Sequence, residues 1–377
     1  MATIRTIGEC ISAKWRVYAT LLLVLVLPGA AWALPPLGLT AIGPAPVVDI
    51  YDPRTFIEVF GDAAYVSNSA GVWTIDEAAQ VSLIQLVHST FGVSKNATRV
   101  VNGPEGALYV GGNFGDHSAV RAALFKLTDP STPVVTYPEL SNLRGIDSSL
   151  RGLGNLGGTA SWFHLDSTFS LLPPAPGTQE RFLFYSSLLG YSLGLASEPG
   201  TLGSAPAFWD ADGNFQFVPG ATGVPSSIRD RRDGTGPNIG WDETAVKYGN
   251  EQSFQIFNAA GPLAIVSQGD FVALSDELTS MGYYPGIVPE QPNIALPLES
   301  IFPELASLDI DAVRDITAVE RYLYMVLEAE GQLYLFGARD PSQIPEPASL
   351  TLTLLGASIA FASFRQRKAA SISNQTP

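Results

Sequence analysis

The sequence predicts an all-β protein made of short strands, and its composition gives the first two reasons. The chain has 377 residues, of which 36 are glycine and 28 are proline. So many glycines and prolines disfavour long helices and favour strands joined by turns. With 46% hydrophobic and 15% charged residues, a wholly disordered chain is excluded. The formal net charge of −15 argues against a nucleic acid as a partner.

A recurring pattern between about Tyr51 and Asp340 is the third reason. Apolar runs that end in Asp or Asn before a turn recur at Trp73–Asp76, Phe125–Asp129, Phe163–Asp166, Phe208–Asp210 and Ile256–Asn258. Their spacing is about 45 residues, which is the length of a β-propeller blade. Residues 51–340 are therefore predicted to form a β-propeller-like domain of about six irregular blades. A β-sandwich whose turns imitate a period remains the alternative.

Three further features refine the predicted domain. The best internal match aligns residues 207–218 with residues 255–266. Residues 206–209, Pro-Ala-Phe-Trp, weakly resemble the secreted repeats named for a His-Ala-Phe core, although the histidine is missing. A proline-rich stretch over residues 270–310 interrupts the period and is predicted to be an insertion or a long loop.

The first 33 residues predict a signal peptide with a helical apolar core. Three cations precede an uncharged run from Val17 to Val26, and Ala31-Trp32-Ala33 fits the small-residue pattern that signal peptidase accepts. We expect cleavage after Ala33, followed by a linker over residues 34–50. An uncleaved membrane anchor is the alternative, although the run is short for a bilayer that needs about 20 apolar residues. Cys10, the single cysteine, would leave with the peptide, so no thiol chemistry is expected of the mature protein.

The C-terminal region has three parts in a fixed order. Pro345-Glu346-Pro347 is followed by an apolar stretch over residues 348–364, and then by Arg365, Arg367 and Lys368. A helix of about 17 residues would be about 26 Å long, which is just enough to span a membrane with help from its flanks. The cations would remain on the cytoplasmic side. A short tail, residues 369–377, follows.

This order, over residues 345–368, resembles the PEP-CTERM sorting signal of exosortase substrates. The resemblance implies that Pro345, Glu346 and Pro347 form the processing site for an exosortase-type enzyme. It also implies that the apolar helix anchors the protein transiently in the inner membrane. An exported protein of the cell envelope or extracellular matrix of a bacterium would follow. The nine residues after Lys368 depart from the family, whose tails end sooner, and an ordinary tail anchor is the alternative.

Candidate catalytic and metal-binding patterns are weak, and no catalytic, metal or cofactor site is predicted. Gly190-Tyr191-Ser192-Leu193-Gly194 matches the nucleophile elbow of α/β hydrolases, but prolines and glycines after it leave little room for the required helix. The three histidines, His88, His117 and His164, all precede Ser192, whereas the hydrolase base follows its serine. They also lack the spacing of a zinc site. Asp210, Asp212 and Asn214 have the first spacings of a calcium loop, but a hairpin tip explains them better.

Two sets of charged residues are also interpreted as parts of the surface without a functional role. Asp309, Asp311 and Asp315 are expected on a solvated strand face, and the cluster of Arg229, Arg231 and Arg232 with two aspartates is expected in a loop. The preferred function is therefore a non-enzymatic structural or binding module that contacts an exopolysaccharide or a surface protein. The alternative is a secreted polysaccharide hydrolase or lyase. That alternative requires carboxylates to converge from several blades, with four candidates: Asp147, Asp166, Asp210 and Asp242.

Overall fold

A computed structural model describes residues 34–46, 54–115, 119–173, 181–197, 204–218, 225–230, 236–241, 244–248, 254–258, 263–266, 271–274, 280–283 and 295–339. The predicted signal peptide and its cleavage residues Ala31 and Ala33 lie outside this part of the chain. So does the predicted sorting segment from Pro345 to Lys368. Within the described part, no helix is long and apolar enough to cross a membrane.

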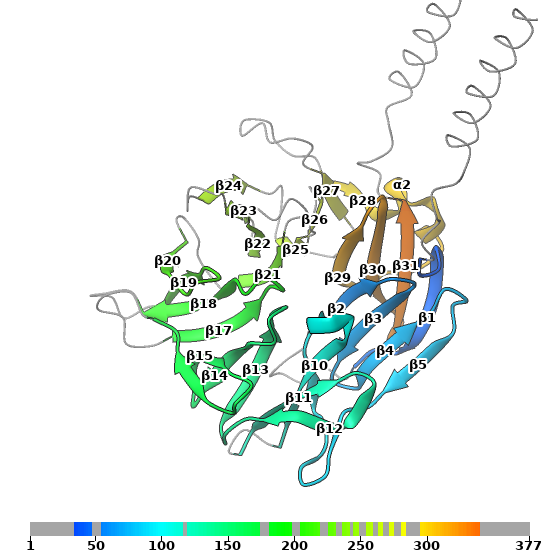
Figure 1. Ribbon diagram of the computed structural model, residues 1–377. Coiled ribbons are helices and arrows are strands. Elements are labelled where there is room, and N and C mark those ends of the chain that lie inside the picture. The colour runs from blue at the N-terminus through cyan, green and yellow to red at the C-terminus, as the bar shows by residue number, and fades with distance from the viewer. Residues whose placement is uncertain are drawn as a thin grey trace, which may run out of the picture.

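The described chain forms seven antiparallel sheets of four or five strands, which we number in chain order (Figure 1). Sheet 1 contains β2 (Phe56–Phe60), β3 (Ala63–Asn68), β4 (Gly71–Ile75) and β5 (Val81–Ile84). Sheet 2 contains β8 (Asn96–Ala97), β9 (Val101–Asn102), β10 (Leu108–Phe114), β11 (Arg121–Lys126) and β12 (Asp129–Thr136). Sheet 3 contains β13 (Ser141–Ile146), β14 (Gly152–Leu156), β15 (Thr159–Phe163) and β16 (Phe169–Leu171).

The remaining sheets follow the same scheme. Sheet 4 contains β17 (Arg181–Ser186), β18 (Ser192–Ser197), β19 (Ser204–Trp209) and β20 (Phe215–Phe217). Sheet 5 contains β21 (Pro225–Asp230), β22 (Pro237–Trp241), β23 (Thr244–Tyr248) and β24 (Phe254–Asn258). Sheet 6 contains β25 (Leu263–Val266), β26 (Phe271–Leu274), β27 (Ser280–Tyr283) and β28 (Ala295–Pro297). Sheet 7 contains β29 (Ala312–Val319), β30 (Tyr322–Ala329), β31 (Gln332–Arg339) and β1 (Gly38–Pro44).

Short elements connect some of these sheets. A two-stranded hairpin of β6 (Val87–His88) and β7 (Gly92–Val93) lies between sheets 1 and 2 in the chain. The short helices are η1 (Pro104–Gly106), α2 (Leu298–Ile301) and η2 (Pro303–Leu305).

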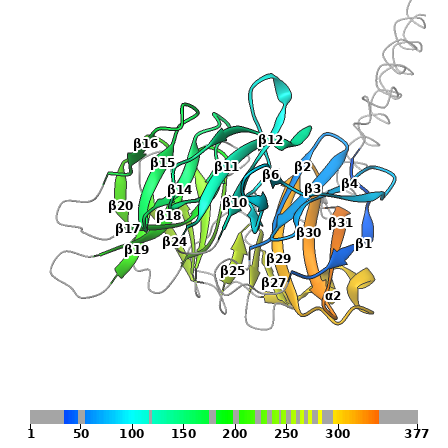
Figure 2. The same cartoon turned by 90° about the horizontal axis from the view of Figure 1, so that it is seen from below.

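The order of strands in the sheets is that of a β-propeller. In sheets 1, 3, 4, 5 and 6 the four strands follow one another in sequence, so each sheet is a simple meander. The first strands of neighbouring sheets contact one another, for example β13 with β17 and β2 with β29, so these strands lie nearest the axis. Figure 2 shows the sheets side by side from a second direction. The all-β prediction is confirmed, the sandwich alternative does not fit, and the described chain has seven sheets where about six were predicted.

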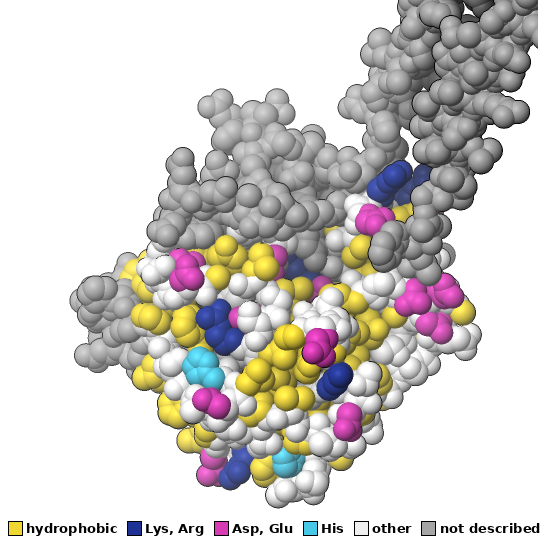
Figure 3. Space-filling model, viewed as in Figure 1, with side chains coloured by type: hydrophobic (Ala, Val, Ile, Leu, Met, Phe, Trp, Pro, Cys, Tyr) yellow, Lys and Arg dark blue, Asp and Glu magenta, His cyan; other side chains and the backbone are white. Residues whose placement is uncertain are grey.

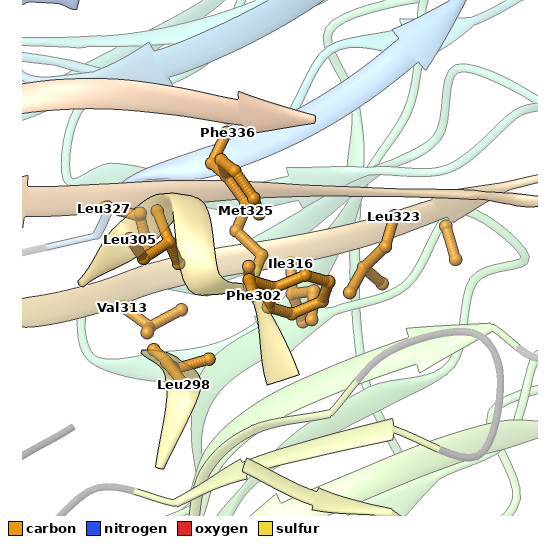
Figure 4. Close-up of a cluster of buried hydrophobic side chains, with 10 residues drawn as sticks. Leu298, Phe302, Leu305, Val313, Ile316, Leu323, Met325, Leu327 and Phe336 are labelled. Atoms are coloured by element: carbon orange, nitrogen blue, oxygen red, sulfur yellow. The ribbon is translucent and has the colours of Figure 1, made fainter. Parts of the chain in front are cut away.

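The hydrophobic core lies between neighbouring sheets. Sheet 7 illustrates this, because successive residues of β30 point to opposite faces. Tyr324 and Val326 pack toward sheet 1, whereas Met325 joins the cluster that α2 and η2 cover (Figure 4). In that second cluster the rings of Phe302 and Phe336 meet edge to face with centroids 5.2 Å apart. Because both faces of sheet 7 are covered, β30 is apolar from Tyr322 to Leu327 instead of alternating.

The first strand of a sheet has a pairing partner on only one side, and two asparagines satisfy its free edge. The Asn113 amide on β10 donates to the Leu143 carbonyl at 2.9 Å, and its oxygen accepts from the Leu143 N–H at 2.8 Å. Asn155 on β14 makes the same two bonds to Leu183, at 2.8 and 2.9 Å. Both asparagines are buried. We call this arrangement the asparagine clamp, and it ties sheet 2 to sheet 3 and sheet 3 to sheet 4.

Residues 34–50, predicted to be a linker, contain a strand of the domain. β1 pairs antiparallel with β31, from Gly38 opposite Gly337 to Pro44 opposite Gln332, and supplies the fourth strand of sheet 7. The prediction fails because β1 is short and lies next to prolines. Its partner is almost the whole chain away, so no local pattern marks it.

The proline-rich range 270–310 also contains regular structure instead of only a loop. β26, β27 and β28 lie within it and form most of sheet 6, and α2 and η2 follow. Proline suits the ends of such elements, because Pro297 closes β28 and Pro303 opens η2. The prolines at 285, 289 and 292 lie outside the described residues.

The predicted period is correct for four of the five anchors. Each of the first four anchors begins near the end of a strand and runs into the turn that follows it. The strands are β4, β11, β15 and β19, and each is the next-to-outermost strand of its sheet. The anchor at Ile256–Asn258 lies on β24, the outermost strand of sheet 5. The internal match of residues 207–218 with 255–266 therefore pairs a hairpin inside sheet 4 with the connection from sheet 5 to sheet 6, and these two segments are not equivalent.

Candidate functional site

Four buried charged side chains from four sheets meet among the first strands. Glu58 comes from β2 and Asp315 from β29. Arg229 comes from β21, and Arg99 lies in the break between β8 and β9. Each side chain is at most 6% exposed. We call these four residues the axial charge cluster.

Arg229 is the centre of the axial charge cluster. Its guanidinium bridges the carboxylates of Glu58 and Asp315, donating to both. The Nε atom of Arg99 lies 3.3 Å from Glu58 Oε1, and its Nη2 lies 3.9 Å from Asp315 Oδ2. Two cations therefore face two anions, and the cluster is neutral as a whole.

Backbone groups complete the cluster and join it to the strands. Arg229 Nη2 donates to the Ile57 carbonyl at 3.0 Å, and the Ile57 N–H donates to Asp315 Oδ2 at 2.9 Å. The Arg99 guanidinium lies 5.0 Å from the centre of the Phe56 ring, a cation–π distance. These contacts connect sheets 1, 2, 5 and 7, of which sheet 5 is not a neighbour of the other three along the chain.

Burial and ion pairing shift the pKa values of these groups in opposite directions. Burial raises the pKa of Glu58 above its usual 4.5, although Arg229 and Arg99 oppose this effect. Burial also acts to lower the pKa of Arg229, but Asp315 and Glu58 outweigh it and raise that pKa. Burial and the nearby Arg229 lower the pKa of Arg99. Of these three groups, Arg229 is the one whose pKa moves in the direction that favours its charged form.

Two more charged residues extend the network toward sheet 4. Arg54, just before β2, donates to the Phe184 carbonyl on β17. Asp230 follows Arg229 and accepts from the Leu189 N–H at 3.0 Å, and burial raises the pKa of its carboxyl group. Charged side chains therefore hydrogen-bond to backbone groups of sheet 4 and of the turn that follows β17.

The sequence interpretation of two cluster members was wrong. Asp315 was expected on a solvated face and Arg229 in a loop, but both are buried and paired. The sequence held a usable signal for Glu58 and Asp315, but not for Arg229. Glu58 interrupts the apolar run Phe56–Phe60, and Asp315, together with Arg314, interrupts the apolar residues between Ala312 and Ala318. A charge inside an apolar strand is expected only where a partner is present.

The register of the first strands positions Asp315. In β13, β17, β21, β25 and β29, pairing with the second strand skips one residue. The skipped residues are Arg144, Phe184, Ser226, Ala264 and Arg314. A bulge turns the following side chain to a new direction. Asp315 directly follows the bulge in β29, and this local shift is not visible in the sequence.

The carboxylates proposed for an enzyme are used to hold turns. Asp147 Oδ1 accepts the N–H groups of Ser149 and Arg151 at 3.0 and 2.9 Å. Asp210 and Asp76 accept from the second and fourth residues after them in the same way. Asp166 accepts from the N–H and hydroxyl of Thr168, and these bonds lower its pKa. Asp242 lies outside the described residues.

Arg151 connects the turn that Asp147 holds to the turn that Asp210 holds. Its Nε donates to Asp147 Oδ2 at 2.9 Å, and its Nη2 donates to the Ala211 carbonyl at 3.0 Å. The guanidinium also lies 4.2 Å from the centre of the Trp162 ring. Asp147 and Asp210 thus belong to neighbouring turns, where each already has its hydrogen bonds.

The calcium-loop spacing is a hairpin tip, as the sequence interpretation preferred. Asp210 Oδ2 accepts from the Asn214 amide at 2.8 Å, and Gly213 has a φ of +87°, which a glycine adopts readily. The turn joins β19 to β20. In the part of the chain that the structure describes, no three His, Cys, Asp or Glu residues are placed to hold a metal ion.

The two described histidines have structural partners. His88 is buried, its ring stacks on Phe91 with centroids 4.1 Å apart, and its Nδ1 accepts from the Thr90 N–H. The proton of the neutral ring is then on Nε2, which lies 3.1 Å from Thr136 Oγ1. Burial and Arg121 lower the pKa of His88 below 6.5. His164 Nε2 lies 3.0 Å from Ser170 Oγ, and His117 is not among the described residues.

Ser192 is not a nucleophile at an elbow. It is the first residue of β18, where a strand follows the turn instead of the helix that the motif requires. The side chain is fully buried, and its hydroxyl has no hydrogen-bond partner among the described residues.

We therefore expect Ser192→Ala to leave any esterase activity of the parent protein unchanged. The free energy of unfolding should stay the same or rise by up to about 1 kcal/mol, because a buried unpaired hydroxyl is removed. Urea denaturation measures this change. Ser187→Ala is the matched control and should lose about 1 kcal/mol, because Ser187 Oγ accepts from the Tyr191 N–H. Loss of an esterase activity in Ser192→Ala would contradict the structural role.

Comparisons with known proteins give likenesses of fold only. No protein-family model and no curated protein matches the chain. Among solved structures, the β-propeller domain of Cps50 (Swd1) from Myceliophteria thermophila has a TM-score of 0.49 at 12% identity, covering 76% of this chain and 96% of that one. A streptogramin B lyase has a TM-score of 0.48 at 9% identity, covering 81% and 94%. Virginiamycin B lyase from Staphylococcus aureus has a TM-score of 0.47 at 9% identity, covering 79% and 98%.

At these TM-scores none of the likenesses decides a function, and the propeller-type architecture rests on the strand order of the chain itself. The surface adds one observation. On the face shown in Figure 3, acidic and basic side chains are interspersed among hydrophobic and neutral ones. A broad basic patch, which a nucleic-acid partner would need, is not seen among the described residues on that face.

Proposed function

We propose that this protein is an exported propeller-type module of the bacterial cell surface or extracellular matrix, without catalytic activity of its own. Its leader would be removed after Ala33. Its C-terminal segment, residues 345–368, would anchor it until an exosortase-type enzyme acts at Pro345-Glu346-Pro347. The processed module would then bind an exopolysaccharide or another surface protein through the loops between its strands.

The roles of four described carboxylates support a module without catalytic activity of its own. Glu58 and Asp315 are buried in ion pairs, and Asp147 and Asp210 hold their own turns. A general acid or base must be within reach of a substrate and free to change its protonation state. Carboxylates committed in this way stabilise a rigid scaffold. The loops of such a scaffold remain available for binding.

The sorting part of the proposal predicts the effect of replacing Pro345-Glu346-Pro347 by three alanines. We expect the full-length form to accumulate in the membrane fraction of the producing bacterium, because the processing enzyme would lose its motif. Immunoblotting of membrane and extracellular fractions with an antibody to the domain measures this shift.

A matched control replaces the adjacent Pro341, Ser342 and Gln343 by alanine, which leaves the motif intact. This variant should be processed as the parent protein is. If the motif variant and the control are processed equally, the exosortase assignment is wrong. An ordinary tail anchor would instead leave all three proteins in the membrane.

The binding part is tested with the exopolysaccharide of the same bacterium. The purified processed protein should sediment with that polymer and leave its size distribution unchanged. Shortening of the polymer would instead support the hydrolase or lyase alternative. If the protein neither sediments with the polymer nor shortens it, the polysaccharide is not the partner.

A further inference from the structure

The two ends of the described domain lie at the same end of sheet 7, on the neighbouring strands β1 and β31. β1 begins opposite the end of β31, with Gly38 paired to Gly337 and Leu39 to Phe336 (Figure 1). The proposed leader cleavage site, between Ala33 and Leu34, is only four residues before β1. The start of the mature chain is thus built into the last sheet to be completed.

The residues between that site and β1 are seated on β30 and β31. Pro35 is buried, and its carbonyl accepts a hydrogen bond from the hydroxyl of Tyr324 at 3.1 Å. Tyr324 itself is fully buried. At Gly337, a Cβ atom would lie 2.6 Å from the Pro36 carbonyl oxygen and 2.8 Å from the Tyr324 ring. A glycine is therefore needed for the close approach of residues 35 and 36 to the sheet.

The buried position of Pro35 would hinder a peptidase from reaching the bond between Ala33 and Leu34. Hydrolysis of the Ala33–Leu34 bond consumes one water and leaves a carboxylate on Ala33 and an α-amino group on Leu34. The enzyme must take the chain on both sides of that bond away from other contacts, and backbone that is buried and hydrogen-bonded resists proteolysis. Pro35, two residues beyond the bond, has both of these properties.

We propose that β1 is a latch that closes the leader cleavage site when it docks on β31, so leader removal must precede completion of sheet 7. This inference rests on the proposed export of the chain. The order of synthesis favours it, because β31 is made almost 300 residues after β1. At about 5–20 residues per second, the cleavage site stays open for about 15–60 s before its latch partner exists. Leader removal would then come before closure of sheet 7.

The test uses the full-length precursor in detergent micelles with purified signal peptidase. We expect folded precursor to be cleaved after Ala33 at least about tenfold more slowly than precursor diluted from urea directly into the enzyme. Mass spectrometry of the released leader identifies the bond and gives the rate.

Two variants test the seat itself. Tyr324→Phe removes one hydrogen bond to Pro35 and should speed cleavage of the folded precursor about two- to tenfold. Gly337→Ala displaces residues 35 and 36 and should speed it at least as much. Tyr322→Phe is the matched control, because it removes a hydroxyl from the same strand, two residues away, and should change nothing. Circular dichroism confirms that each variant is folded before the assay.

The outcomes separate the latch from the export proposal. Equal cleavage of folded and urea-diluted precursor overturns the latch and leaves the leader assignment standing. Equal rates for Tyr324→Phe, Gly337→Ala and Tyr322→Phe also overturn it, because protection would not depend on the seat. If neither form of the precursor is cleaved after Ala33, the leader assignment is wrong and the latch falls with it.

Discussion

Replacing Arg229 by methionine is expected to lower the free energy of unfolding by about 3–5 kcal/mol, the cost of leaving a buried charge without its partner. Arg229 bridges Glu58 and Asp315 and also donates to the Ile57 carbonyl. Methionine fills similar space but provides no donor. Two buried carboxylates would then share Arg99 alone. Urea denaturation followed by tryptophan fluorescence measures the loss.

Two controls make this result specific to the axial charge cluster. Arg321→Met removes an exposed arginine and should change stability by no more than about 0.5 kcal/mol. The double variant Arg229→Met with Glu58→Gln should recover part of the loss, because one uncompensated charge is removed as well. If Arg229→Met costs no more than Arg321→Met, the cluster does not hold the sheets together.

The loss should also depend on pH in a defined direction. Burial already raises the pKa of Glu58, so the folded state binds a proton there more readily than the unfolded chain does. Such a group contributes stability below the unfolded pKa of 4.5, and this contribution is lost as pH rises through the folded pKa. Removing Arg229 raises the pKa of Glu58 further. The deficit of Arg229→Met should therefore be larger at neutral pH and shrink as the solution is acidified toward that pKa.

Sequence reasoning succeeded where the cause of a structure is local. The turn at Asp210 is an example, because its two backbone hydrogen bonds come from residues two and four positions later. Any chain with aspartate, glycine and asparagine at those positions favours such a turn. The position of Ser192 is another example. Prolines and glycines downstream exclude the helix of a nucleophile elbow whatever the rest of the fold is.

It failed where the cause is a partner far along the chain. β1 becomes a strand only because β31 offers an edge almost 300 residues later. Arg229 is buried only because Glu58 and Asp315 come from two other sheets. The charge-rich surroundings of Arg229 in the sequence resemble a solvated loop, and composition cannot show that one of these charges is turned inward. Counting units by their anchors failed for the related reason that the anchor on β24 belongs to a different strand of its sheet.

Replacing Asn155 by alanine is expected to lower the free energy of unfolding by about 2–4 kcal/mol, because two buried backbone groups of Leu183 lose their partners together. β17 pairs with β18 on one side only, so the N–H and C=O of Leu183 on the other side depend on this amide. Among the described residues, no neighbouring strand pairs with that side of β17. Asn113→Ala should cost a similar amount, since its clamp to Leu143 has the same geometry.

Asn102→Ala is the matched control, because Asn102 is exposed on β9 and its loss should change stability by no more than about 0.5 kcal/mol. Asn155→Asp separates the two bonds of the clamp, since a carboxylate still accepts from the Leu183 N–H but cannot donate to the carbonyl. At neutral pH the new carboxylate is a buried charge, so Asn155→Asp should be at least as destabilising as Asn155→Ala. In acid the carboxyl group is protonated, and Asn155→Asp should then destabilise the protein less than it does at neutral pH. Equal stability of Asn155→Ala and Asn102→Ala would mean that apolar packing alone joins sheets 3 and 4. A large difference would instead show that a propeller whose inner strands have a free edge needs side-chain amides to complete them.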